Sequence, residues 1–131
     1  MSIEEEELPP NVLRIMDAKE VIQTKDYTVK DLYLPGERGD VEFTVTITNL
    51  NAGRQTRGHT HEDFVELFEF KSGEGFFLLN GRAIRVKSGL FCLVPKGMHH
   101  KVINISSSQP LIFLTYFPSG LFRKDVRRVL T

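Results

Sequence analysis

The sequence contains one cysteine, no tryptophan and no long hydrophobic run. A single cysteine, Cys92, cannot form an internal disulfide bond, and without a Cys-x-x-Cys pair the chain has neither a redox dithiol nor a thiolate zinc site. The longest apolar runs, residues 90–94 and 111–117, have the length of β-strands, whereas a membrane-spanning helix needs roughly 20 residues. Any metal ion would therefore have to bind His, Asp or Glu.

Neither sign of charge is in excess. The chain has 131 residues, with 17 Lys and Arg against 17 Asp and Glu, and a length of this order predicts one domain. Nucleic-acid binding requires a basic surplus that is missing here. The acidic N-terminus also lacks the basic and apolar regions of a secretory signal. We therefore expect a cytoplasmic protein with a small-molecule ligand and with no nucleic-acid or membrane partner.

Alternation of apolar and polar residues predicts a β-rich body. From Val41 to Thr48 the side chains alternate with a period of two, as in a half-buried strand. Turn residues, including the hairpin pair Asn80-Gly81, separate the other short runs rich in Phe, Leu and Val. These runs are residues 64–70, 76–79, 83–86, 90–94, 102–105 and 111–117. Short strands at such spacing predict an all-β sandwich or barrel over residues 27–117.

Only the two ends have helical patterns. Residues 17–23 predict a short helix, and residues 121–130 place apolar side chains on one helical face. The predicted organisation is an acidic leader with a short helix (1–26), a β-barrel (27–117) and a C-terminal helical tail packed on the barrel (118–131).

All four histidines lie in two short segments. His59 and His61 are one residue apart, so in an extended segment both imidazoles project from the same face. Glu66 follows among phenylalanines, where an isolated carboxylate is costly unless it is paired or binds a metal. His100 lies just after a Pro-Lys-Gly loop and would supply a third imidazole. These residues predict a transition-metal site.

The residues around the histidines follow two motifs. The first segment reads Gly53, five residues, His59-Thr60-His61, four residues, Glu66, six residues, Gly73. The second reads Gly89, five residues, Pro95-Lys96-Gly97, two residues, His100, three residues, Asn104. Both resemble the paired motifs of the cupin superfamily, G-x5-H-x-H-x3-4-E-x6-G and G-x5-P-x-G-x2-H-x3-N. The resemblance implies an all-β cupin jelly-roll barrel of six to eight strands, with one divalent metal held by His59, His61, Glu66 and His100.

Three neighbouring residues are predicted to lie outside the ligand set. His99 should face away from His100 on a strand, Asn104 should be structural, and Cys92 should be a core residue. The ligand types suit Fe, Mn, Ni, Zn, Co or Cu and do not select among them.

The resemblance implies several functions. Residues 56–61 and 110–118 resemble the cupin-type glucose-6-phosphate isomerases, which implies that Thr56 and Gly58 bind phosphate, Arg57 adds charged contacts and Glu66 is both ligand and candidate catalytic base. Those enzymes have a tyrosine before the final proline, where this sequence has Phe117. The resemblance makes sugar-phosphate isomerisation the first hypothesis.

Two other classes of function stay open. An iron-dependent dioxygenase or metal-dependent lyase would use the metal positions that three imidazoles and one carboxylate leave free. A non-enzymatic small-ligand-binding module is the third hypothesis. We also predict a homodimer, to which exposed residues such as Val65 and Leu67 would contribute.

Overall fold

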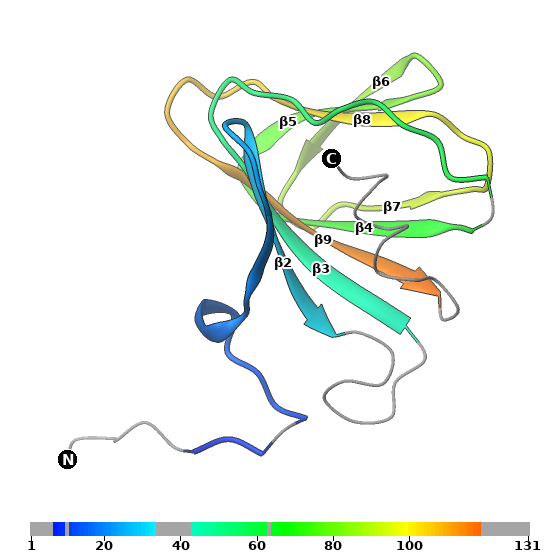
Figure 1. Cartoon of the computed structure of the whole chain (residues 1–131). Coiled ribbons are helices and arrows are strands. Elements are labelled where there is room, and N and C mark those ends of the chain that lie inside the picture. Colours follow the sequence, from blue (N-terminus) through cyan, green and yellow to red (C-terminus); the bar gives the residue numbers. More distant parts are fainter. Residues whose placement is uncertain (1–6, 10, 34–42, 63, 119–131) are drawn as a thin grey trace.

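The computed structural model describes residues 7–9, 11–33, 43–62 and 64–118, which contain nine strands and one short helix (Figure 1). The helix is the 3₁₀ turn η1, Ile15–Asp17. The strands are β1 (Glu20–Gln23), β2 (Tyr27–Tyr33), β3 (Phe43–Leu50), β4 (Glu66–Ser72), β5 (Glu74–Leu79), β6 (Arg82–Lys87), β7 (Phe91–Val94), β8 (His100–Asn104) and β9 (Leu111–Pro118).

The strands form two antiparallel sheets. One sheet has the order β1-β2-β3-β9-β4-β7, and the other has the order β6-β5-β8. Figure 1 shows the smaller sheet lying across from the larger one, with the interior between them. Buried and more exposed side chains alternate along β4 and β8, as expected for strands with one face toward a core. The prediction of an all-β barrel is confirmed.

Tight turns hold the smaller sheet together. Asn80 and Gly81, with φ angles of 48° and 82°, form the hairpin between β5 and β6 that the Asn-Gly pair predicted. At Gly75, opposite Asn104, an added Cβ atom would lie 2.0 Å from the carbonyl oxygen of Ile103. A side chain at this position would therefore force β5 and β8 apart.

Four phenylalanines fill the centre of the barrel. Phe68, Phe70, Phe77 and Phe113 are at most 3% exposed, and their ring centroids lie 4.7 to 6.2 Å apart in the contacting pairs. Full burial of each such side chain contributes about 1.5–3 kcal/mol to folding. Leu50, the last residue of β3, and Leu111, the first residue of β9, pair with each other and continue this core.

The prediction of a helix over residues 17–23 is wrong. Residues 20–23 form β1, which pairs with β2, and Ile22 is buried in the core. Val21 and Ile22 are β-branched and favour a strand once a partner strand is present, so tertiary pairing overrides the weak helical pattern. The barrel therefore begins before residue 27. Residues 121–130, the second predicted helix, lie outside the described residues.

No helix in the described parts of the chain is long and apolar enough to span a membrane.

Candidate metal centre

The two histidine segments lie side by side. The N–H of His59 donates to the carbonyl of His100 at 3.1 Å, and the N–H of His100 donates to the carbonyl of His59 at 2.9 Å. This reciprocal bridge joins the segment after β3 to the first residue of β8. The two imidazole centroids are 4.3 Å apart, and His61 lies 4.9 Å from each. The predicted convergence of three imidazoles is confirmed.

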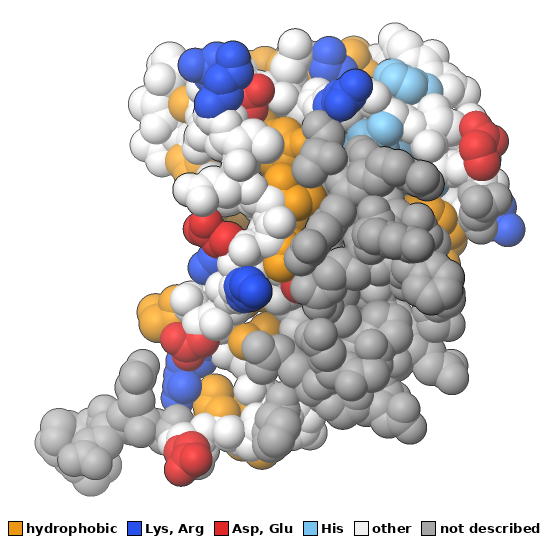
Figure 2. All heavy atoms as spheres, in the orientation of Figure 1, with side chains coloured by type: hydrophobic (Ala, Val, Ile, Leu, Met, Phe, Trp, Pro, Cys, Tyr) orange, Lys and Arg blue, Asp and Glu red, His pale blue; other side chains and the backbone are white. Residues whose placement is uncertain are grey.

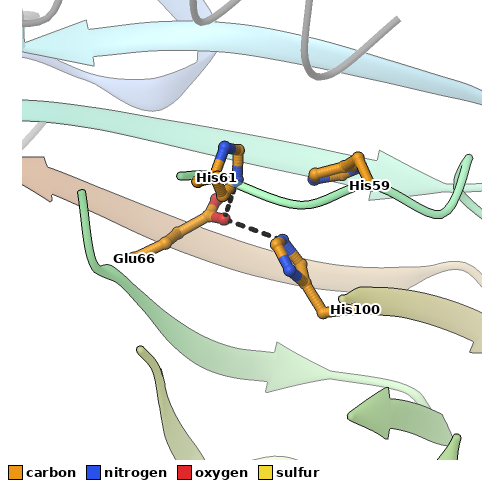
Figure 3. Close-up of side chains that lie close together, drawn as sticks. All are labelled: His59, His61, Glu66 and His100. Carbon is orange, nitrogen blue, oxygen red and sulfur yellow. Dashed lines mark hydrogen bonds and ion pairs between the residues drawn. The ribbon is translucent and has the colours of Figure 1, made fainter. Parts of the chain in front are cut away.

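Glu66 completes the cluster from the first residue of β4 (Figure 3). Its Oε1 lies 2.7 Å from His61 Nε2 and 3.0 Å from His100 Nε2, and the residue is 0% exposed. One donor atom from each of the four residues falls within 4.8 Å of the others. Two ligands on opposite sides of a shared ion, each about 2.1 Å away, are about 4.2 Å apart. The cluster is therefore compatible with a metal ion after small side-chain shifts.

Backbone carbonyls select the tautomers of two histidines. His59 Nδ1 lies 2.7 Å from the carbonyl oxygen of Arg57, and His100 Nδ1 lies 3.1 Å from that of Met98. A carbonyl oxygen only accepts, so each Nδ1 must carry the proton, which leaves Nε2 of the neutral ring unprotonated and turned into the cluster. This pairing of an outer N–H with a carbonyl is the arrangement that orients metal-binding histidines.

The same tautomers make the contact between His100 and Glu66 informative. With its Nδ1 proton donated to Met98, His100 can donate from Nε2 to Glu66 only as an imidazolium cation. Otherwise a nitrogen lone pair and a carboxylate oxygen face each other at 3.0 Å. In either case a cation belongs at this point, and it is either a proton or a metal ion.

Burial and hydrogen bonds shift the pKa values of His59 and Glu66. Burial, reinforced by the neighbouring charge of His100, lowers the pKa of His59 to about 4. Burial by itself raises the pKa of Glu66, but the hydrogen bonds from His100 and His61 outweigh it, and the pKa lies below its usual value. A neutral imidazole and an ionised carboxylate are the forms that bind metals.

Two buried atoms of the cluster lack a protein partner. His59 Nε2 and Glu66 Oε2 are inaccessible to solvent and make no hydrogen bond to the described residues. Buried polar atoms are nearly always satisfied, and an unpaired one costs about 1–3 kcal/mol. A transition metal between the imidazoles and the carboxylate would satisfy both atoms, so the residues present fit such an ion.

Aromatic residues and a small cavity border the cluster. The Phe64 ring is tilted by 34° against His61, with the ring centroids 4.3 Å apart, and Phe68 meets His100 edge-on at 5.6 Å. The cavity has a free volume of about 20 Å³, enough for about one water molecule, and is lined by Tyr27, Thr56, His59, His100 and other residues. In Figure 2, histidine side chains reach the surface at one end of the molecule, beside Lys and Arg.

The three predicted phosphate-binding residues adjoin the cluster. The Thr56 hydroxyl accepts the N–H of Val102 at 2.9 Å, so it fixes the segment to β8. An added Cβ at Gly58 would lie 2.7 Å from Cε1 of the exposed His99 side chain, so the two residues are in close contact. Arg57 is exposed. Phosphate binding by Thr56, Arg57 and Gly58 stays a prediction.

His99, Asn104 and Cys92, which the sequence analysis placed outside the ligand set, all lie outside the four-residue cluster. His99 is exposed and lies outside the four-residue cluster. Asn104 is buried and its side-chain amide donates to the carbonyls of Leu50, Asn51 and Gln109, so it ties the loops together. Cys92 packs against the core, and burial raises the pKa of its thiol.

Sequence reasoning missed Tyr27 and the carbonyl of Met98. Tyr27 is 5% exposed and lines the cavity beside His59 and His100. Its inward direction was readable from the period-two pattern of its strand, but its distance from the histidines was not. The carbonyl contacts carry no side-chain signal, although both join a histidine to the residue two positions before it.

Several solved structures share this fold. An RmlC-like cupin from Shewanella frigidimarina is 14% identical, with a TM-score of 0.70 over 87% of this chain and 93% of that chain. A predicted oxalate decarboxylase from Thermotoga maritima is 23% identical, with a TM-score of 0.72 over 82% and 98% of the two chains. The polyketide cyclase RemF from Streptomyces resistomycificus is 20% identical, with a TM-score of 0.69 over 87% of each chain. Likeness at these identities shows a cupin-type fold and leaves the activity open.

The sequence comparison defines the family. No match was found among curated proteins. A model of the family described as the cupin domain matches residues 46–117, more than half of the 131-residue chain. The chain belongs to the cupin domain family, and the matched span contains all four residues of the candidate metal centre.

Proposed function

We propose that this cupin is a mononuclear divalent-metal enzyme that acts on a small oxygenated metabolite. The proposal rests mainly on two buried atoms without a hydrogen-bond partner among the described residues, His59 Nε2 and Glu66 Oε2, within a cluster of four donor groups. Such a pair is costly in a protein that binds nothing there and is satisfied in one that binds a cation. Three imidazoles and one carboxylate suit Fe, Mn, Ni, Zn, Co or Cu.

Each residue of the centre has a defined task in this proposal. His59, His61 and His100 hold the metal through neutral nitrogens, and Glu66 adds a negative charge. When bound, a divalent metal polarises a substrate carbonyl or hydroxyl oxygen. Glu66 is both a metal ligand and a candidate base in this proposal, because a carboxylate has two oxygens and one can bind the metal while the other accepts a substrate proton. Phe64 and Phe68 limit the access of water.

The first reaction to test is aldose–ketose isomerisation of a sugar phosphate. It requires an electrophile at the carbonyl oxygen, one base and a site for a phosphate, and exposed Arg57 lies two residues before His59. The assay is interconversion of glucose 6-phosphate and fructose 6-phosphate by protein loaded with Mn, Ni or Zn. Turnover that is lost in Glu66→Gln while metal remains bound is the expected result. No turnover with any metal would refute this reaction.

The aromatic lining favours a second candidate, an iron-dependent dioxygenase or a metal-dependent lyase. Phe64 and Phe68 give the histidines a dry border, which protects reactive intermediates from water. Oxygen uptake by the iron form with diketone or phenolic substrates tests the dioxygenase. If the iron form takes up no oxygen with any of these substrates, the dioxygenase hypothesis is refuted.

The metal itself is tested by elemental analysis of protein purified without added metal. We expect about one equivalent in the parent and little in His59→Ala/His100→Ala, since each lost ligand costs at least 10–100-fold in affinity. His99→Ala is the matched control, because it removes a neighbouring imidazole that lies outside the cluster. Absence of metal from the parent, even after reconstitution, would refute the proposal and favour a non-enzymatic ligand-binding module. The predicted homodimer is tested separately by light scattering.

A further inference from the structure

A surface groove lies against the metal centre at the seam between the two sheets. It has a volume of about 480 Å³ and is formed by the turn over residues 24–27, the segment over residues 55–58 and Lys101 on β8. Hydrogen bonds fix the turn beside the chain after β3: the backbone N–H of Asn51 donates to Asp26, and its side-chain amide donates to Lys25. Figure 1 shows the tip of the blue β1–β2 hairpin at the same end as that segment.

The groove has a surplus of positive charge. Lys25, Arg57 and Lys101 all line it, and none of them lies within ion-pair distance of a carboxylate in the described parts of the chain. Asp26 is the acidic residue among the lining residues, and Arg54 lies 3.6 Å from it. The lining residues therefore carry three cations against one carboxylate that is already paired with Arg54, so the groove has a net positive charge. Figure 2 shows Lys and Arg side chains at this end of the molecule.

Two residues connect the groove with the inner cavity. Tyr27 and Thr56 line both spaces, and the inner cavity also touches His59 and His100. The inner space has room for about one water molecule, so a compact oxygen-bearing group fits there and a bulky one does not. A ligand that spans both spaces would place one small polar end near the histidines and leave its other end among the cations.

The structure also indicates which groups are available to an anion. The Thr56 hydroxyl already bonds to Val102, and the His99 imidazole covers Gly58. The side chains of Arg57, Lys101 and Lys25 make no ion pair with a carboxylate in the described structure, so their charged groups are available to an anion. Guanidinium and ammonium groups form charge-assisted hydrogen bonds with carboxylates and phosphates.

We propose that this groove holds the anionic group, carboxylate or phosphate, of a small metabolite whose oxygen-bearing end passes between Tyr27 and Thr56 toward the metal centre. This proposal rests on the function proposed above and narrows its substrate to small anions. It assigns the recognition of charge to Arg57 and Lys101 on one wall, with Lys25 on the other.

The test is an NMR titration of the isotopically labelled full chain, as purified with its metal, with sodium phosphate and sodium acetate at constant ionic strength. We expect saturable shifts of the amides of residues 55–58 and of Lys101 with at least one of the two anions. The anion that binds more tightly distinguishes a phosphate-bearing from a carboxylate-bearing ligand. Arg57→Gln/Lys101→Gln should weaken binding about tenfold or more, because it removes two charge-assisted contacts.

The control variant is Arg82→Gln/Lys87→Gln, which removes the same charge from β6 in the smaller sheet. It should bind the anions as the parent does. Saturation by neither anion, or equal weakening in both double variants, would overturn the proposal.

Metal content of the same samples separates the two proposals. If the chain binds metal but no anion, the proposal of an anion-binding groove is overturned and the proposal of a metal enzyme stands. If the amides of residues 55–58 and Lys101 show saturable anion binding but the chain never holds metal, anion binding in the groove is supported and the proposal of a metal enzyme is overturned.

Discussion

Two regions of the same barrel interior are built on opposite principles. The aromatic cluster of Phe68, Phe70, Phe77 and Phe113 is complete, since every ring is covered by other rings and aliphatic side chains. In the histidine cluster His61, Glu66 and His100 are equally buried and His59 is partly buried, but the cluster retains a nitrogen and an oxygen without partners among the described residues. The first region stabilises the fold by its own contacts, whereas the second contains two buried polar atoms that no described protein group satisfies. Burial alone therefore does not identify a residue as part of the stabilising core.

Truncation in the aromatic cluster should have the largest effect on stability. Phe70→Ala removes a 1% exposed ring that contacts three other phenylalanines, and we expect a loss of about 3–5 kcal/mol in the free energy of unfolding. Urea denaturation measures it. Phe91→Ala is the control, because Phe91 is 57% exposed and its truncation should change stability by about 0.5 kcal/mol or less. Equal losses in both variants would contradict the comparison.

Metal addition should stabilise the histidine cluster almost as strongly. At a free Zn²⁺ concentration of about 100 times Kd, binding to the folded chain adds about 2.7 kcal/mol to the free energy of unfolding. The measurement is urea denaturation with Zn²⁺ and with a chelator. In His59→Ala the increment should disappear, whereas the metal-free stability should change little, because an unpartnered buried nitrogen is removed together with one hydrogen bond. A metal-free loss as large as that of Phe70→Ala would show that His59 is an ordinary core residue.

Removal of the hydrogen bond between Tyr116 and Glu69, on the outer face of the larger sheet, should have a smaller effect on stability. The Tyr116 hydroxyl donates to Glu69 Oε1 at 2.7 Å, and burial together with this bond raises the pKa of Tyr116 to about 12. Tyr116→Phe should lose about 1 kcal/mol at pH 8. Because the folded state holds this proton more tightly than the unfolded state, the contribution of Tyr116 is present below pH 10 and lost between about pH 10 and 12. The stability difference between parent and variant should therefore shrink over that range, and a constant difference would contradict the assignment.

The smallest effect is expected at the histidine beside the cluster. His99→Ala removes an exposed imidazole next to His100, and both stability and metal content should stay at the parent level, within about 0.5 kcal/mol for stability. Thermal unfolding and elemental analysis measure the two quantities. Loss of metal in this variant would mean that the cluster contains a fifth ligand.

The comparison also explains what the sequence could predict. Period-two alternation and the Asn80-Gly81 turn located most strands to within a few residues, because each strand carries its own pattern. The four-residue cluster could be predicted because the chain has only four histidines and three of them lie with Glu66 at fixed motif spacing. The strand at Glu20–Gln23 was missed, since its pairing with β2 depends on a partner that local propensity does not reveal. Lys25 and Tyr27 escaped the site prediction for the same reason, because only the folded chain brings them beside residues 55–58.

The reciprocal backbone bridge between His59 and His100 has a consequence for how the protein matures. The bridge joins segments that are distant in the chain, so the chain between them must close into a loop for the bridge to form. A nascent or partly unfolded chain would present His59 and His61 without His100 and would hold an ion weakly. If the chain binds a metal as proposed, retention of the ion would report that the barrel has closed, and metal loading would depend on folding.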